Sequence, residues 1–126
     1  KGCKYIHPHK PDIRLKGIFT DKEPYENYLY QIVIENNQQV NYITEKYTNC
    51  LCYNTIPIYW GGININKYFG NNCCYILEKN IQNDFNKIKE IYNNPKKYIL
   101  DLKNSQKELF FGQCYLPNFI CKEFQL

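Results

Sequence analysis

The sequence predicts an open α/β domain in which helices flank a mostly parallel sheet. Short, continuous apolar runs alternate along the chain with longer segments whose apolar residues recur at helical spacing. Continuous apolar runs are typical of strands buried on both faces, as in a parallel sheet covered by helices. With 126 residues, 44% of them hydrophobic, the chain suffices for one such domain with a core.

Three of these runs predict strands. Residues 30–34 (YQIVI) give the first, residues 55–60 (TIPIYW) the second and residues 73–77 (CCYIL) the third. Gly61 and Gly62 end the second strand with a tight turn. Strands that alternate with helices along the chain indicate crossover units and therefore parallel pairing.

Four segments predict helices. The first begins near Ile43, because the following apolar residues share one helical face with it: Tyr47, Cys50 and Leu51. Residues 64–69 predict a short helix or a turn, and residues 80–94 a longer helix with apolar positions at Ile81, Phe85, Ile88, Ile91 and Tyr92. Pro95 stops that helix and suits the first turn of another, over residues 95–111.

Both ends of the chain are predicted to be less regular. Residues 1–24 form a loop-rich opening segment, because three prolines and a glycine interrupt them, and residues 112–126 form a tail that packs back as a short helix. The whole chain, residues 1–126, is predicted to be a single domain. Since it contains no methionine, we expect a processed product or an excised domain whose partner domain lies upstream.

Charge and cysteine content limit the classes of function that the sequence supports. A net charge of +4, carried almost entirely by lysine, favours an anionic ligand weakly and gives no argument for nucleic acid. The seven cysteines form no C-x-x-C pairs, so we interpret them as structural, and Cys3, His7 and His9 lack a fourth ligand for a metal. Without an Asn-x-Ser/Thr sequon, a signal peptide or a membrane span, the pattern leans towards a cytoplasmic or otherwise reducing setting.

The junction after the first strand carries the main functional hypothesis. In open α/β sheets, ligands bind beyond the carboxyl ends of the strands, where Glu35 and Asn36 lie. The amino end of the following helix is a natural phosphate seat, and Lys46 adds a full positive charge there. Glu45 can accept hydrogen bonds from vicinal hydroxyls, and Tyr42 offers a ring. Together they predict a site for a nucleotide diphosphate with attached sugars, although a solvated Glu-Lys pair in a first helical turn is also common.

A family resemblance points the same way. The stretch YQIVIENNQQVNYITEKYTNCLCYNTIPIYWGG resembles the donor-binding signature of the α1,3/α1,4-fucosyltransferases, glycosyltransferase family 10. The match combines Glu-Asn, then Tyr-x-x-Glu-Lys, then a strand ending in Trp-Gly. It holds in register over about residues 28–62 and more loosely to about residue 103.

The resemblance implies a fold, a donor and roles for individual residues. The chain would be the C-terminal, Rossmann-like half of a two-domain GT-B glycosyltransferase that binds GDP-fucose and transfers fucose, with inversion, to a glycan hydroxyl. Lys46 would face the diphosphate and stabilise the departing GDP without a metal. Glu45 would bind ribose or fucose hydroxyls and stabilise the oxocarbenium-like carbon, so these two residues are the catalytic candidates. Tyr42 would contact the nucleotide.

Three further residues complete the predicted donor site, and some features of the family are missing. Glu35 and Asn36 would shape the rim of the donor pocket, and Arg14, the only arginine, is the candidate for a phosphate-facing arginine. The resemblance places the family's general base and its glycan acceptor site in an N-terminal domain, which we expect to lie outside this chain, and the Cys-x-x-Cys of animal members is absent. We therefore expect the chain to bind nucleotide better than it catalyses transfer.

Two other functions stay open from the sequence. The same fold can use another nucleotide sugar, or the chain can be a non-catalytic module that binds nucleotide sugars or carbohydrates. Measuring which nucleotide the chain prefers distinguishes an enzyme that uses another nucleotide sugar from one that uses GDP-fucose. A nucleic-acid-binding module rests only on the small positive charge and the tyrosines.

Overall fold

A computed structural model of the chain describes residues 3–4, 18–20 and 22–112. Its centre is a three-stranded parallel sheet in the order β3–β4–β5, with β3 at Tyr30–Ile34, β4 at Ile56–Trp60 and β5 at Tyr75–Ile76. The predicted α/β class and the first two strands are confirmed. The third strand is shorter than predicted. A separate antiparallel pair joins β1 (Cys3–Lys4) to β2 (Ile18–Phe19) within the segment predicted to be loop-rich.

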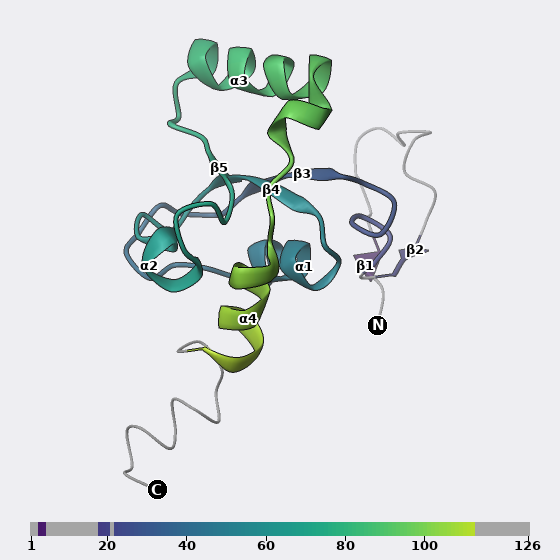
Figure 1. The fold of residues 1–126 in the computed structure, drawn as a ribbon, viewed down its shortest axis with the longest axis vertical. Coiled ribbons are helices and arrows are strands. Elements are labelled where there is room, and N and C mark those ends of the chain that lie inside the picture. Colours follow the sequence, from purple (N-terminus) through teal and green to yellow (C-terminus); the bar gives the residue numbers. More distant parts are fainter. Residues whose placement is uncertain (1–2, 5–17, 21, 113–126) are drawn as a thin grey trace, which may run out of the picture.

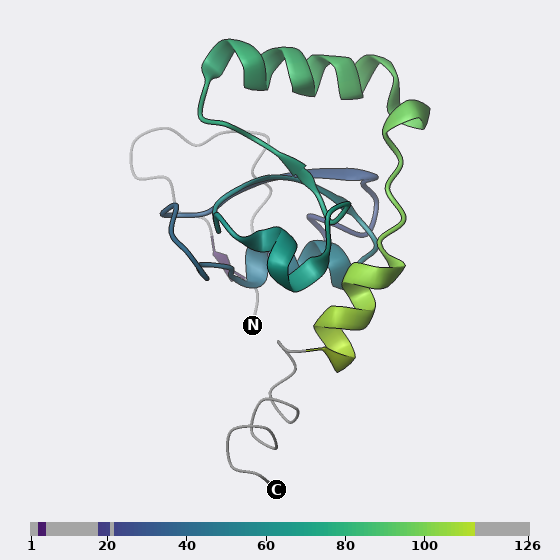
Figure 2. The same ribbon diagram turned by 60° about the vertical axis from the view of Figure 1, so that its left-hand side comes forward.

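Helices cover the sheet from both sides. In Figures 1 and 2, α1 (Glu45–Cys52), α2 (Ile65–Phe69) and α4 (Lys103–Phe111) lie below the sheet. The long helix α3 (Ile81–Asn93) and the short 3-10 helix η1 (Pro95–Tyr98) lie above it. Both α1 and α2 connect successive parallel strands. Both connections run in the same direction across the sheet. Because such crossovers are right-handed, both helices lie on the same face.

The main core lies between the sheet and the lower helices. Its buried members come from every layer on that side: Val33, Tyr47, Cys50, Leu51, Ile56, Tyr59, Ile65, Phe69, Cys73, Cys74 and Leu102. The Tyr47 ring is completely buried, and its centroid lies 5.1 Å from that of Tyr59 and 5.0 Å from that of Phe69. The Tyr47 hydroxyl donates to the backbone carbonyl of Cys73 at 3.2 Å. Cysteines 50 and 73 pack here as small apolar residues.

The upper layer is thinner than the sequence predicts. The helix at residues 80–94 forms, as α3, but Ile81 is 91% exposed and Tyr92 82% exposed, and Ile91 is its one buried residue. Ile91 packs with Ile58 and Leu77 in a small second cluster. Helical spacing thus predicted the helix correctly but overestimated how much of its apolar face the described residues cover.

The prediction of a single helix over residues 95–111 is wrong. Two elements, η1 and α4, stand there with an extended residue, Ile99, between them. Two tyrosine hydroxyls from the sheet hold η1 in place, because Tyr30 donates to the carbonyl of Pro95 at 2.7 Å and Tyr75 to that of Tyr98 at 2.9 Å. Asp101 then accepts the amide of Lys103 at 3.0 Å, a local bond of the kind that starts a new helix.

The predicted tail beyond Gly112 lies outside the described residues, as does most of the opening segment. No helix in the part that the structure describes has the length and apolar character needed to cross a membrane.

Tyr47→Phe should reduce the free energy of unfolding by about 1–3 kcal/mol, because it leaves the buried Cys73 carbonyl without its donor. Urea unfolding measures this change. Tyr92→Phe is the matched control, since Tyr92 is 82% exposed and should lose almost nothing. Equal changes in both variants would show that the buried hydroxyl contributes no stability.

Candidate functional site

Glu35 organises the carboxyl end of β3. It directly follows the strand, the residue is only 2% exposed, and its backbone amide continues the ladder by donating to the Trp60 carbonyl at 2.9 Å. The carboxylate accepts twice from Thr44, at 3.0 Å from the backbone amide and at 2.8 Å from the hydroxyl. A buried carboxylate is costly unless it is paired, and these two bonds supply much of that pairing. They also join the end of β3 to the start of α1.

Thr44 is the N-cap of α1, so the helix begins at Glu45, two residues after Ile43, near which its start was predicted. Its hydroxyl accepts the amide of Lys46 at 3.3 Å, while its carbonyl accepts the amides of Tyr47 and Thr48. The Glu35 carboxylate adds negative charge at the same helix end, where the macrodipole favours it. The amino end of α1 is therefore largely satisfied by the chain itself and is less open to a phosphate than the sequence suggested.

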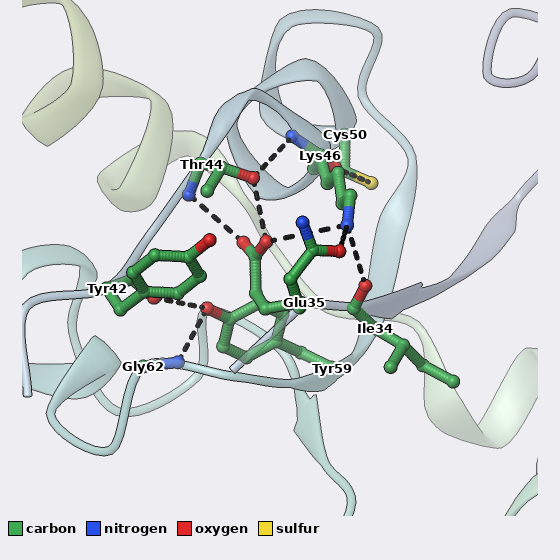
Figure 3. A network of polar contacts seen from close by, with 9 residues as sticks. Ile34, Glu35, Tyr42, Thr44, Lys46, Cys50, Tyr59 and Gly62 are labelled. Atoms are coloured by element: carbon green, nitrogen blue, oxygen red, sulfur yellow. Dashed lines mark hydrogen bonds and ion pairs between the residues drawn. The ribbon is translucent and has the colours of Figure 1, made fainter. Parts of the chain in front are cut away.

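Lys46 holds its ammonium group at the same strand end. Its Nζ donates to the Ile34 carbonyl at 3.1 Å and to Asn36 Oδ1 at 3.0 Å, and lies 4.0 Å from the Glu35 carboxylate (Figure 3). A lysine ammonium has three donors, so one N–H has no protein acceptor among the described residues. The side chain is 38% exposed. The charge is thus fixed in position but still accessible to a ligand.

A tyrosine supports Glu35 from beneath. The Tyr59 hydroxyl accepts the amide of Gly62 at 2.8 Å and donates to the carbonyl of Tyr42 at 3.3 Å. Burial raises the pKa of the Tyr59 phenol to about 12, with the Glu35 charge acting in the same direction and the Gly62 amide opposing it. The phenol therefore stays protonated and can donate at neutral pH. A Cβ at Gly61 would collide with both Tyr59 and Glu35, so the glycine is required for close packing here.

The loop between β3 and α1 is anchored to α2. Asn41 adopts the left-handed conformation, with φ of 64°. Its amide donates to Asn64 Oδ1 at 2.8 Å, and its own Oδ1 accepts from the Asn64 side-chain amide at 2.7 Å and from the Tyr68 hydroxyl at 2.6 Å. Asparagine tolerates this conformation better than most residues. These contacts fix the loop that carries Tyr42 towards α1.

The structure brings most of the predicted residues together. Figure 3 shows Tyr42 and Lys46 on either side of Glu35, and Asn36 contacts Lys46 directly. Glu45 is exposed on the first turn of α1 and makes no side-chain hydrogen bond with the described residues. Arg14 lies outside the described residues. Glu35, predicted at the rim of the pocket, is instead buried beneath it with its carboxylate occupied.

Sequence reasoning missed Thr44 and Tyr59. Thr44 carried a signal, since a threonine immediately before a helix, followed by an acid, is a common N-cap pattern. Tyr59 lies within an apolar strand run and carried none, because only the tertiary structure places its hydroxyl between Tyr42 and Gly62.

Two pockets lie at or near the carboxyl edge of the sheet. One, of about 290 Å³, follows the outer side of β3 and reaches Lys46. The other, of about 280 Å³, is lined by the ends of all three strands, with Lys79 and Asp84 beside Trp60. No group of three or more metal-ligating side chains occurs within the described ranges. His7, His9 and the side chain of Cys3 lie outside them.

Thr44→Ala should lower the free energy of unfolding by about 1–2 kcal/mol, because it removes both the helix cap and one bond to buried Glu35. Thermal or urea unfolding measures the loss. Thr44→Ser should recover most of it, and Thr48→Ala, within the same helix, should cost less than Thr44→Ala. A Thr44→Ala variant as stable as the unmodified chain would contradict the capping role.

Comparisons with known proteins identify the family of this chain. The family described as glycosyltransferase family 10 (fucosyltransferase), C-terminal region, matches residues 16–114. Alpha-(1,3)-fucosyltransferase B of Drosophila melanogaster is 31% identical over 110 residues, which cover 79% of this chain and 23% of that protein. No solved structure matches the chain. The chain thus spans about a quarter of the length of this curated relative. The family match covers most of the chain and includes every element of the strand-end site, so the chain belongs to glycosyltransferase family 10, the fucosyltransferases.

Proposed function

We propose that this chain is the donor-binding part of a GDP-fucose-dependent fucosyltransferase. The observation that carries the proposal is the Lys46 ammonium, held at the carboxyl end of β3 by Ile34 and Asn36 with one N–H unclaimed by the described residues. A diphosphate oxygen is the natural acceptor for that donor, and the position agrees with the rule that ligands of open α/β sheets bind beyond the strand ends.

The proposed reaction breaks the bond between the fucose anomeric carbon and the diphosphate. Negative charge then builds on the departing GDP, and Lys46 stabilises it without a metal. The acceptor hydroxyl of a glycan attacks the opposite face of the sugar, which inverts the anomeric configuration. A general base must take the proton from that hydroxyl, and in this proposal another part of the enzyme, in a two-domain GT-B arrangement, supplies the base and the acceptor site.

The remaining roles follow from exposure and position. Glu45 is exposed one residue before Lys46, so its carboxylate can accept hydrogen bonds from ribose or fucose hydroxyls. The half-buried Tyr42 offers its ring to the nucleotide from the other side of Glu35. Asn36 acts on the donor through Lys46, which it holds in place. Glu35 supports the whole arrangement from the interior and contacts no donor atom in this proposal.

Lys46→Ala should weaken GDP binding by about 1.5–3 kcal/mol, the value of a charge-assisted hydrogen bond. Calorimetric titration with GDP measures the change. Lys87→Ala is the matched control, because Lys87 likewise donates to a strand carbonyl, that of Ile76 at 2.8 Å, but on β5, which β4 separates from β3. Unfolding curves for both variants show whether either mutation alters the fold. GDP affinity unchanged by Lys46→Ala would exclude the phosphate role.

Glu45→Gln should leave the unfolding midpoint unchanged, because the side chain is exposed and makes no hydrogen bond with the described residues. It should weaken GDP-fucose binding or slow fucose transfer, since a neutral amide replaces an anion that accepts hydrogen bonds from sugar hydroxyls. Parallel titrations with GDP and GDP-fucose show which sugar Glu45 contacts. Weaker binding of both ligands indicates the ribose, and weaker binding of GDP-fucose alone indicates the fucose. A variant that unfolds would show that Glu45 is structural.

Titration with UDP separates this proposal from its alternative within the same fold. Binding of UDP as tight as that of GDP would favour another nucleotide sugar as the donor. Saturable GDP binding without fucose transfer by the intact protein would favour a non-catalytic nucleotide-sugar module.

A further inference from the structure

Two adjacent cysteines stand where the chain enters β5. Cys73 and Cys74 lie between the exposed turn at residues 70–72 and the strand, and both belong to the main core. Their Sγ atoms are 3.7 Å apart, and both are free thiols. A disulfide bond is about 2.05 Å long, so only a small movement separates this pair of thiols from the disulfide-bonded form.

The two thiols differ in acidity. The hydrogen bond with Cys74 lowers the pKa of the Cys73 thiol, the Tyr47 hydroxyl and the Cys73 backbone act in the same direction, and burial opposes them. The pKa of the Cys74 thiol is raised, by the same hydrogen bond and by burial. The shared proton therefore stays on Cys74. Cys73 is the sulfur that ionises first and acts as the nucleophile.

The surroundings of the pair admit only a small reagent. Cys73 is fully buried and Cys74 is 9% exposed, so a bulky disulfide cannot reach either sulfur in the folded protein. The turn directly before them is exposed, however, and Cys73 Sγ donates at 3.4 Å to Oδ1 of Asn66, an exposed residue of α2. Cys73 thus lies just beneath the surface. Local opening of the turn gives access to a molecule little larger than water, such as hydrogen peroxide.

We propose that Cys73 and Cys74 form a redox site, in which a small hydroperoxide converts the two thiols into a disulfide. The Cys73 thiolate attacks the peroxide, which forms an S–O bond, breaks the O–O bond and releases hydroxide that takes up the Cys73 proton as water. The Cys74 sulfur then attacks the sulfenic sulfur of Cys73. The S–S bond forms, the S–O bond breaks, and the second hydroxide leaves as water with the Cys74 proton. Two thiols are oxidised and one hydrogen peroxide is reduced to two waters.

Such a disulfide is readily reversed. The Cα atoms of adjacent residues lie about 3.8 Å apart across a trans peptide bond, closer than the roughly 4.4 Å or more that is usual in disulfides. A disulfide between neighbours is therefore strained, and strained disulfides are the ones that thiols reduce easily. A cellular dithiol reductant returns the pair to its reduced form.

The redox state of the pair acts on α1 through Tyr47. The ring that closes contains the peptide bond between the two cysteines, and the carbonyl of that bond accepts the Tyr47 hydroxyl at 3.2 Å. Closing the ring turns this carbonyl, which leaves a completely buried hydroxyl without its acceptor. Tyr47 directly follows Lys46 in α1. Oxidation thus loosens the helix that carries Lys46, and its effect on GDP binding rests on the proposed function.

Peroxide treatment followed by peptide mass mapping tests the site in the intact natural polypeptide. The tryptic peptide of residues 68–79 contains Cys73 and Cys74 and no other cysteine. After treatment and alkylation of the remaining thiols, this peptide should be unalkylated and about 2 Da lighter than its dithiol form, because two hydrogens are removed. Dithiothreitol should reverse the change. The peroxide dose is the lowest that oxidises Cys52, whose exposed thiol is the internal reference.

Three results at this dose would overturn the inference. The first is a 68–79 peptide that remains fully alkylated, the second is oxygen added to it without loss of hydrogen, and the third is a disulfide to any other cysteine peptide. Among variants, Cys74→Ser should leave Cys73 as a sulfenic acid that dimedone labels. Cys52→Ser, the matched control with one cysteine fewer, should show the same loss of mass as the unmodified protein.

Thermal unfolding tests the link to Tyr47. Oxidation should lower the unfolding midpoint of the unmodified protein, and dithiothreitol should restore it. Tyr47→Phe should show a smaller drop on oxidation, because it lacks the hydroxyl whose acceptor the ring displaces. Equal drops in the two proteins would overturn the link through Tyr47.

GDP titration tests the consequence for the ligand site. The oxidised protein should bind GDP several-fold more weakly than the reduced protein, whereas Cys73→Ala should bind it equally before and after peroxide. An affinity that oxidation leaves unchanged would overturn this consequence. The mass and unfolding measurements use no nucleotide. Failure of the redox site is therefore distinguishable from failure of the reduced protein to bind GDP, which would count against the proposed function.

Discussion

The buried carboxylate of Glu35 is the constraint on which the rest of this site depends. It stands at the end of β3, is 2% exposed, and must be satisfied by neighbours because water cannot reach it. Thr44 supplies two hydrogen bonds, which fixes where α1 starts and how the loop returns to the sheet. Gly61 must lack a side chain so that β4 can pass beside the carboxylate. Loss of the Thr44 side chain leaves the buried charge without one of its partners, which is more costly than the loss of an exposed ion pair, whereas a side chain at Gly61 would collide with Glu35 and Tyr59.

The same arrangement determines which groups remain free to act on a ligand. Because Thr44 and Glu35 occupy the amino end of α1, the backbone amides there contribute little to anion binding. The accessible positive charge at the strand end is the side chain of Lys46, and its position is set by the Ile34 carbonyl and by Asn36. Glu35 lies 4.0 Å away and offsets part of this charge. In the proposed function, a diphosphate therefore binds beside a carboxylate, and its affinity depends also on the contacts proposed for Glu45 and Tyr42.

Below the site, the structure is built from tyrosine as much as from aliphatic residues. Tyr47 and Tyr59 are fully buried and pack edge to face, with ring centroids 5.1 Å apart. Each hydroxyl donates a hydrogen bond to a backbone carbonyl. An aromatic ring supplies a large buried area, while the hydroxyl satisfies a backbone group that would otherwise be orphaned. The upper face has no comparable core among the described residues, since Ile81, Phe85 and Tyr92 of α3 remain largely exposed.

The α/β class, the positions of β3, β4, α1, α2 and α3, and the family are predictable from the amino-acid sequence, because they depend on periodicity, glycine and proline positions and a specific motif over about residues 28–62. The sequence also places Glu35, Asn36, Tyr42, Glu45 and Lys46 at one strand-to-helix junction, since they are close along the chain. Which of these side chains is buried depends on the tertiary structure. Local pattern does not show that the Glu35 side chain turns inward to Thr44, or that the Tyr59 hydroxyl links Tyr42 to Gly62, because these contacts join β4 to the β3–α1 loop. The break between η1 and α4 could not be predicted for the same reason. The two tyrosines whose hydroxyls hold η1 lie 65 and 23 residues before the carbonyls that they contact.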